Sequence, residues 1–202
     1  MKKIIFLILA LFAWKHFYYV GSAPELGPGI LAGGAPYQDP TTVAKFRKGD
    51  YTYYPRANFQ IEARVLSVSK YYFDQEARIS PVDFALGWGQ MSDESILQHI
   101  DIWQESRWYK WESKLMPIAK SEIIDSSANM HMIPDNEVVA AELKKVRNGD
   151  LVNIQGYLVD VHKNTGWKWK TSTSRSDTGA GACEIIYVKR IEIINPYERL
   201  YY

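Results

Sequence analysis

The sequence predicts a mainly β domain with some α structure (α+β), built as a small OB-like β-barrel with one main helix and an inserted segment. Three observations carry this prediction. Strand patterns separated by turn residues recur along the chain, only one segment has a clear helical period, and that helix falls between the third and fourth predicted strands. A helix in that place is the OB arrangement. An SH3-like or other mixed β-sheet domain is the alternative.

The first strand is predicted over Phe59–Phe73, where apolar residues alternate with polar ones and slip in register near Leu66. An inserted segment is expected between Asp74 and Gln98, with a short helix capped by Ser92. The next two strands would form a hairpin over 100–112, with Glu105 and Ser106 near its turn.

The main helix is predicted directly after Pro134 and Asp135. Val139, Leu143 and Val146 have the i, i+4, i+7 spacing that places apolar side chains on one helix face. The sequence Asn148-Gly149 that follows is typical of a helix end.

Three strands complete the predicted domain, over Leu151–Val161, Trp167–Thr173 and Cys183–Ile194. Gly156 interrupts the apolar face of the first of these and indicates a bend or a bulge. In the second, Trp167 and Trp169 share one face and the lysines beside them share the other.

The amino terminus has the pattern of an exported protein. Lys2 and Lys3 precede an apolar run from Ile4, which can be a cleaved signal or, read through to Val20, a membrane anchor. We therefore divide the chain into a signal peptide or membrane anchor (1–23), a Gly- and Pro-rich tether (24–40) and the OB-like domain (41–202). The folded part is expected to begin near Thr41 and to face the periplasm.

Composition excludes several classes of function. The 202 residues carry a net charge of +1, and without Lys2, Lys3 and Lys15 the remaining chain has 21 basic and 23 acidic side chains. A body so close to neutral gives no electrostatic argument for nucleic acid. The single cysteine, Cys183, rules out an intramolecular disulfide and a cysteine zinc cluster, and no histidine pair has metal-binding spacing. No metal or cofactor is predicted.

The sequence holds fragments of catalytic motifs. Asp177-Thr178-Gly179 has the local pattern of an aspartic protease half-site, but that chemistry needs two copies and this sequence has one. His131 lies in a strand-like run and is the histidine most suited to a catalytic or ligand role. The catalytic candidates are therefore His131 and Asp177. Cys183 opens a strand with apolar neighbours, so we expect a buried, unreactive thiol.

Aromatic and basic residues alternate in two of the predicted strand regions, as on surfaces that stack bases or sugars. Exposed rings there would bind a ligand, whereas buried rings would belong to the core. An anion could also bind the polar, Gly-containing loop that follows. The candidate binding residues are Trp108, Trp111, Trp167, Trp169 and Arg175.

Three stretches of the sequence together resemble a known family: Ser80-Pro-Val-Asp-Phe-Ala-Leu-Gly-Trp-Gly, Ser127-Ala-Asn-Met-His-Met-Ile-Pro and Ser174-Arg-Ser-Asp-Thr-Gly-Ala-Gly-Ala-Cys-Glu. They resemble an uncharacterised family of exported or membrane-anchored proteins from Gram-negative bacteria. The resemblance implies a location in the cell envelope and brings no activity, ligand or catalytic residue with it.

We therefore predict a membrane-tethered, periplasm-facing module that binds an envelope protein or polymer, with residues 4–20 holding it to the inner membrane. If the signal is cleaved, the module is secreted to the periplasm. No catalytic motif is complete, so binding is favoured over catalysis. The alternatives are a hydrolase that uses His131 with Asp177 or a Ser, and a purely structural subunit of an inner-membrane complex.

Overall fold

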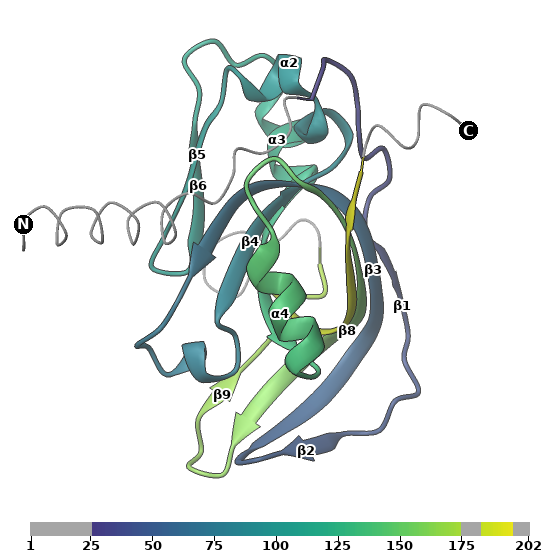
Figure 1. Ribbon diagram of the computed structural model, residues 1–202, viewed down its shortest axis with the longest axis vertical. Coiled ribbons are helices and arrows are strands. Elements are labelled where there is room, and N and C mark those ends of the chain that lie inside the picture. Colours follow the sequence, from purple (N-terminus) through teal and green to yellow (C-terminus); the bar gives the residue numbers. More distant parts are fainter. Residues whose placement is uncertain (1–25, 175–182, 196–202) are drawn as a thin grey trace, which may run out of the picture.

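The computed structural model describes residues 26–174 and 183–195 (Figure 1). Five strands close into a ring in which each strand pairs with two others. In order around the ring they are β3 (Tyr51–Lys70), β4 (Val82–Gly87), β7 (Ser127–Pro134), β10 (Glu184–Ile194) and β8 (Leu151–Lys163). The pairing of β7 with β10 is parallel and the other four are antiparallel.

Three short strands extend the ring to an eight-stranded mixed sheet. They are β1 (Tyr37–Asp39) and β2 (Phe46–Lys48), which pair with β3, and β9 (Lys168–Trp169), which pairs with β8. The predicted mainly β, α+β class is confirmed. The strand predicted over Trp167–Thr173 is reduced to the two residues of β9, because Thr171 and Ser172 instead bond to Asp160 and to the start of β10.

The ring closes because its long strands bend. The register of β3 against β4 shifts between Val65 and Ser67, which confirms the slip expected near Leu66. At Gly156 of β8, an added Cβ would lie 2.1 Å from the carbonyl oxygen of Tyr187. Only glycine permits this close approach, and the register of β10 shifts just beyond it, between Val188 and Arg190.

The core fills the ring and is closed by helix α4 (Glu137–Lys145). Phe84, Met130 and Ile154 are fully buried inside the ring, and Val139 and Leu143 bring the apolar face of α4 against the same cluster. The side chain of Asn136 accepts hydrogen bonds from the first free N–H groups of α4. The predicted helix and its buried face are confirmed.

An aromatic cluster covers part of the outer face of the ring. Its buried members include Tyr53 and Tyr187, and Trp167 and Trp169 pack against it. Some ring strands are thus buried on both faces. β4 shows this most clearly, since all six of its residues are buried.

The inserted segment lies between β4 and β7, not between Asp74 and Gln98 as expected. It comprises η2 (Gly89–Ser92), α2 (Glu94–Leu97), the hairpin of β5 (Asp101–Glu105) and β6 (Trp108–Glu112), and α3 (Lys120–Asp125). The predicted hairpin exists but forms its own two-stranded sheet. Its inward residues pack on a separate cluster around Met91 and Ile123, which is why it stays outside the ring.

The expected insertion instead contains the ring strand β4 and the short helix η1 (Glu76–Arg78). A strand buried on both faces has no alternation for a period-two pattern to detect. The first ring strand also begins earlier than predicted, at Tyr51 rather than Phe59.

The segment before β1 is irregular but packs against the inserted segment. Leu26 and Ala32 are buried, and the hydroxyl of Ser92 accepts hydrogen bonds from the N–H groups of Leu31 and Ala32. Asp93, not Ser92, caps α2. The folded part therefore extends to residues well before Thr41.

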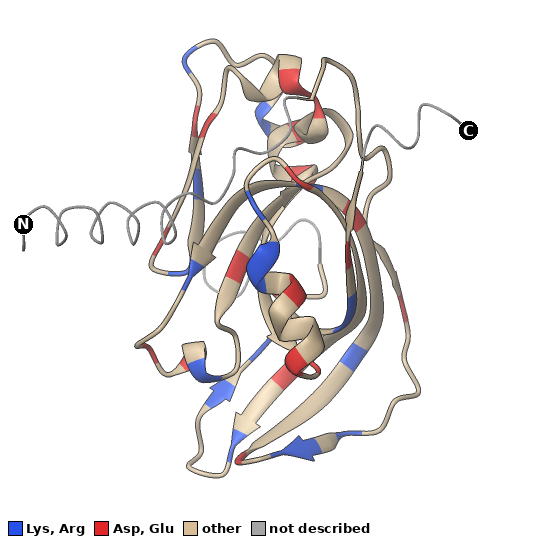
Figure 2. Ribbon diagram, in the orientation of Figure 1, with Lys and Arg blue, Asp and Glu red and all other residues tan. Residues whose placement is uncertain are grey.

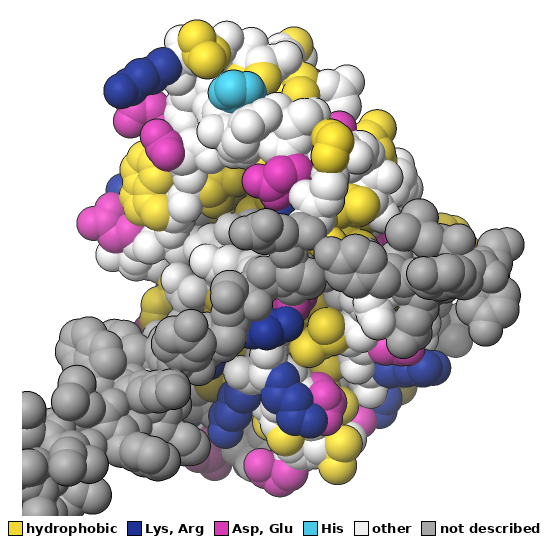
Figure 3. Space-filling model, turned by 45° about the horizontal axis from the view of Figure 1, so that its top comes forward, with side chains coloured by type: hydrophobic (Ala, Val, Ile, Leu, Met, Phe, Trp, Pro, Cys, Tyr) yellow, Lys and Arg dark blue, Asp and Glu magenta, His cyan; other side chains and the backbone are white. Residues whose placement is uncertain are grey.

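No helix among residues 26–174 and 183–195 is long and apolar enough to cross a membrane. The predicted signal or anchor lies outside the described residues, as do two candidate site residues, Arg175 and Asp177. Figure 3 shows hydrophobic side chains exposed among charged ones on the face that carries the inserted segment.

Candidate functional site

A pocket of about 400 Å³ lies on the outer face of the ring, where the β3–β4 loop, the β5–β6 hairpin and β9 meet. Its lining combines aromatic, basic and acidic side chains with one thiol: Glu76, Arg107, Trp108, His131, Lys168, Trp169, Lys170 and Cys183. Most of these residues come from loops or strand ends, and the strands β4 and β7 form the rigid support beneath them.

The base of the pocket is a buried pair of Asp83 and His131. The two residues are directly opposite one another on β4 and β7, and the Asp83 Oδ2 atom lies 2.9 Å from His131 Nδ1. The Asp83 side chain is fully buried and that of His131 is 4% exposed. Neither atom has another hydrogen-bond partner among the described residues.

The charge on His131 is decided by two opposing effects. Burial alone would lower the pKa of the imidazolium, but the hydrogen bonds and charges of Asp83 and Cys183 outweigh burial and raise it to about 9. His131 is therefore a cation at neutral pH, and the Asp83 carboxylate is its counter-ion.

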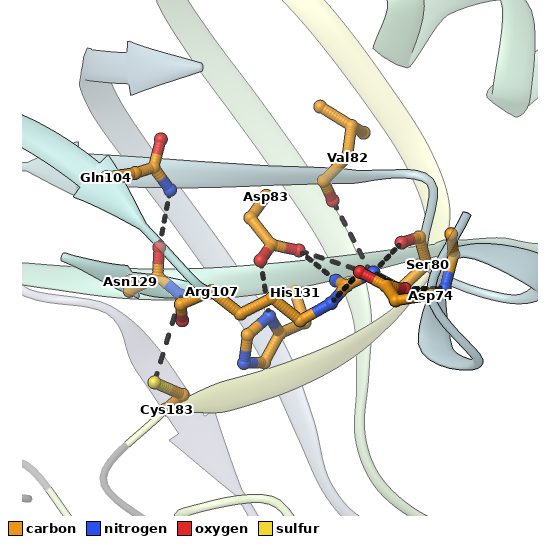
Figure 4. Close-up of polar contacts among 10 residues, drawn as sticks. Asp74, Ser80, Val82, Asp83, Gln104, Arg107, Asn129, His131 and Cys183 are labelled. Atoms are coloured by element: carbon orange, nitrogen blue, oxygen red, sulfur yellow. Dashed lines mark hydrogen bonds and ion pairs between the residues drawn. The ribbon is translucent and has the colours of Figure 1, made fainter. Parts of the chain in front are cut away.

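Arg107 provides the second partner of Asp83 (Figure 4). Its guanidinium lies 3.1 Å from Asp83 Oδ1 and binds both oxygens of Asp74, at 2.7 and 3.1 Å. It also packs on the Tyr71 ring, 3.9 Å from the ring centroid. The Arg107 hydrogen bond holds the pKa of Asp74 below its usual range.

A two-residue turn delivers Arg107 to this position. Ser106 and Arg107 have φ values of 51° and 65°, and Glu105 pairs with Trp108 on either side of them. Positive φ at both central residues fits the tight hairpin turns that match strand twist, although residues with a Cβ adopt it at a cost. Strained backbone of this kind gathers at functional sites.

Cys183 lies at the start of β10, beside His131. The Sγ atom is 3.8 Å from the amide nitrogen of Asn129, whose carbonyl oxygen accepts a 2.6 Å hydrogen bond from Gln104. The thiol is partly exposed and lines the pocket. The expectation of a buried thiol is wrong, because the strand begins one residue later and Cys183 stands at its open end.

The predicted binding residues separate in the structure. Trp169 and Trp108 line the pocket, and the Trp169 ring lies 4.7 Å from the His131 ring. Trp167 packs on Tyr51 at 6.2 Å, next to the pocket but outside its lining. Trp111 belongs to the cluster under the hairpin. Lys168 and Lys170 are exposed and line the pocket together with Trp169.

Charge is arranged around the pocket in two layers. Figure 2 shows basic residues on β2 and β9, at the lower end of the molecule. At the base, Asp83 and Asp74 already neutralise Arg107 and His131. An incoming ligand would therefore meet the positive charges of Lys168 and Lys170. Glu76 is the acidic residue of the pocket lining.

Sequence reasoning identified His131 but missed Asp83, Arg107 and the part that Cys183 plays. Asp83 was detectable as an acid inside the otherwise apolar run Val82–Gly87, where a charge needs a buried partner. The meeting of Arg107 with Asp83 had no local indication, because 24 residues separate them.

Within residues 26–174 and 183–195 no group of three or more His, Cys, Asp and Glu side chains is arranged to hold a metal ion. No protein-family model matches the sequence, and no curated protein matches it. The resemblance to an envelope family stays a prediction.

Proposed function

We propose that the five-stranded ring is an OB-like barrel. Its strand order, the parallel pairing of its third and fifth strands, and the position of α4 between its third and fourth strands support this assignment. In OB domains, the face of the second and third strands and the loops beside it bind oligomeric ligands. The pocket is lined by His131 of β7, the third strand of the ring, which pairs with Asp83 of β4, the second.

We propose that the protein is a periplasm-facing binding module, tethered to the inner membrane by residues 4–20, whose ligand is an anionic, sugar-containing polymer of the envelope. The location is inferred from the amino-terminal sequence pattern. The observation that carries the binding function is the pocket itself, where the Trp108 and Trp169 rings stand beside Lys168 and Lys170. Indole rings stack on sugars, and ammonium groups pair with carboxylates or phosphates.

Titration of the purified protein with a soluble disaccharide–peptide fragment of peptidoglycan, which carries carboxylates, tests this proposal. We expect saturable heat of binding, lost on Trp108→Ala and weakened on Lys168→Gln. A neutral N-acetylglucosamine oligomer of similar length should bind at least tenfold more weakly, because it lacks the anionic groups.

Trp103→Ala is the matched control, because Trp103 is as exposed as Trp108 (41% and 40%) and is not part of the pocket lining. It should bind like the wild-type protein. Equal loss of affinity in the two tryptophan variants would place binding elsewhere on the hairpin. Absence of binding to both sugars would contradict the proposed ligand class.

A further inference from the structure

The base of the pocket brings a thiol, an imidazole and a carboxylate together. Asn129 and His131 lie on the outer face of β7, and the register of the parallel pair places Cys183 level with Asn129 on β10. His131 and Cys183 line one pocket, and Cys183 is one of the groups that raise the pKa of His131. Asp83 contacts the other side of the imidazole from β4. Asp83 and His131 therefore lie on two neighbouring ring strands, and Cys183 directly precedes the third.

The order of these contacts is that of an activated nucleophile. A base beside the nucleophile, oriented by a third group, is the arrangement that makes serine and cysteine side chains attack carbonyl carbon. Asp83 occupies Nδ1 of His131, which fixes the ring and leaves Nε2 as the nitrogen that can exchange a proton with the thiol.

We propose that Cys183 is the nucleophile of an acyl-transfer site in which His131 is the acid and base and Asp83 is the positioning residue. The substrate class is a carbonyl compound with a leaving group: an ester, a thioester or an amide. The inference concerns the base of the pocket and does not depend on which polymer the rim binds.

Charged and aromatic groups surround His131 on several sides. His131 faces Asp83 from β4, Cys183 from β10 and the Trp169 ring from β9, with Arg107 approaching from the hairpin turn. Asp83 is in direct contact with both His131 and Arg107, and Asp74 binds Arg107 as a second carboxylate. Lys168 and Lys170 line the same pocket as Cys183.

The reaction balances without a redox partner. The Cys183 thiolate forms a C–S bond to the carbonyl carbon, the bond to the leaving oxygen, sulfur or nitrogen breaks, and the His131 imidazolium gives its proton to the leaving group. Neutral His131 then takes a proton from water as the hydroxide attacks the thioester. The C–S bond breaks, the acid is released, and the thiolate and imidazolium are restored.

Alkylation of the full-length protein by iodoacetamide tests the thiolate directly, because Cys183 is the only cysteine in the chain. An ordinary thiol of pKa about 8.5 reacts roughly tenfold faster at pH 7.5 than at pH 6.5. We expect the rate at Cys183 to stay level between these two pH values. A tenfold rise would overturn the proposal, and this measurement requires no variant.

The acyl step is tested with p-nitrophenyl acetate as the probe. We expect a burst of p-nitrophenol of about one equivalent, an acetyl group on Cys183 by mass spectrometry, and steady turnover afterwards. Cys183→Ala should remove both the burst and the adduct. A wild-type protein that forms no acetyl adduct would contradict acyl transfer even if its thiol alkylates readily.

Two variants test the roles of His131 and Asp83. In His131→Gln, the rate of Cys183 alkylation should rise with pH as it does for an ordinary thiol. In Asp83→Asn, Cys183 should stay reactive, but the pH range over which the alkylation rate is constant should move to higher pH. A merely structural role for Asp83 would lower the melting temperature without moving the pH profile. Lys145→Gln, a change on the exposed face of α4, should leave the profile unchanged.

Discussion

At the residue scale, the decisive feature is a charged pair that is almost completely buried at the base of the pocket. Asp83 and His131 are both almost completely buried, and separating them from solvent is favourable only because each neutralises the other and Arg107 adds a second contact to Asp83. Removing one member would leave a buried charge alone, whereas the intact cluster holds the imidazole ring in one orientation. The site is therefore rigid before any ligand arrives.

The His131 pair should make stability depend on pH. Because its folded pKa of about 9 exceeds the unfolded value of 6.5, the contribution of His131 is fully present below pH 6.5 and is lost as pH rises through 9. At about 1.4 kcal/mol per pKa unit, the shift corresponds to roughly 3 kcal/mol. Urea unfolding at pH 6.5, 8 and 9.5 should show the free energy of unfolding falling in the wild-type protein.

His131→Gln is the control for this measurement, and its stability should change much less over the same interval. If both proteins lose stability in parallel, His131 is not the titrating group.

At the element scale, the fold depends on how closely β8 approaches β10. The two strands pair from Leu151 to Leu158, and the bulge in β10 directly follows the contact between Gly156 and Tyr187. This bend lets β8 reach both β10 and β3 and so closes the ring. The same closure carries β10 to β7, where its first residues stand beside His131.

Gly156→Ala should therefore destabilise the protein strongly. The added Cβ would meet backbone at 2.1 Å, so the strands must separate, and we expect a loss of about 3 kcal/mol or more in chemical unfolding. Gly34→Ala is the matched control, since nothing lies within 4 Å of its Cβ position and its φ is not positive. Similar stability of the two variants would contradict the close approach.

At the scale of the whole molecule, the segment that precedes β1 is part of the folded body. Gly29 donates to Asp93, Ala32 accepts from Gly89, and Leu26 packs with Leu151 at the start of β8. These contacts join the amino-terminal side of the domain to the inserted segment and to the ring. A tether to the membrane would therefore have to lie before Leu26.

A fragment that starts at Thr41 should be less stable than one that starts at Leu26. The shorter fragment loses the burial of Leu26 and Ala32 and the hydrogen bonds to Ser92, and we expect a cost of about 2 kcal/mol. Thermal unfolding of 26–202 and 41–202 compares the two. Equal melting temperatures would mean that the segment contributes nothing to the folded state.

The sequence by itself determined the elements whose pattern is local. α4 could be predicted because its buried face repeats at helical spacing, although it ends at Lys145, before the Asn148-Gly149 expected to stop it. The bends near Leu66 and Gly156 could be predicted because each interrupts an alternating strand. The β class followed from residues that alternate with a period of two, and the same period gives the alternating tryptophans and lysines of residues 167–170.

Only the tertiary structure decided which strands make the ring and what lies around His131. β4 is buried on both faces and has no alternation to read, so the sequence placed an insertion where a central strand runs. Asp83 on β4, His131 on β7 and Cys183 just before β10 are far apart in the chain, and their meeting depends on the pairings β4–β7 and β7–β10. Local periodicity records which side of an element is buried, whereas a site assembled across strands depends on register and closure, which are properties of the whole sheet.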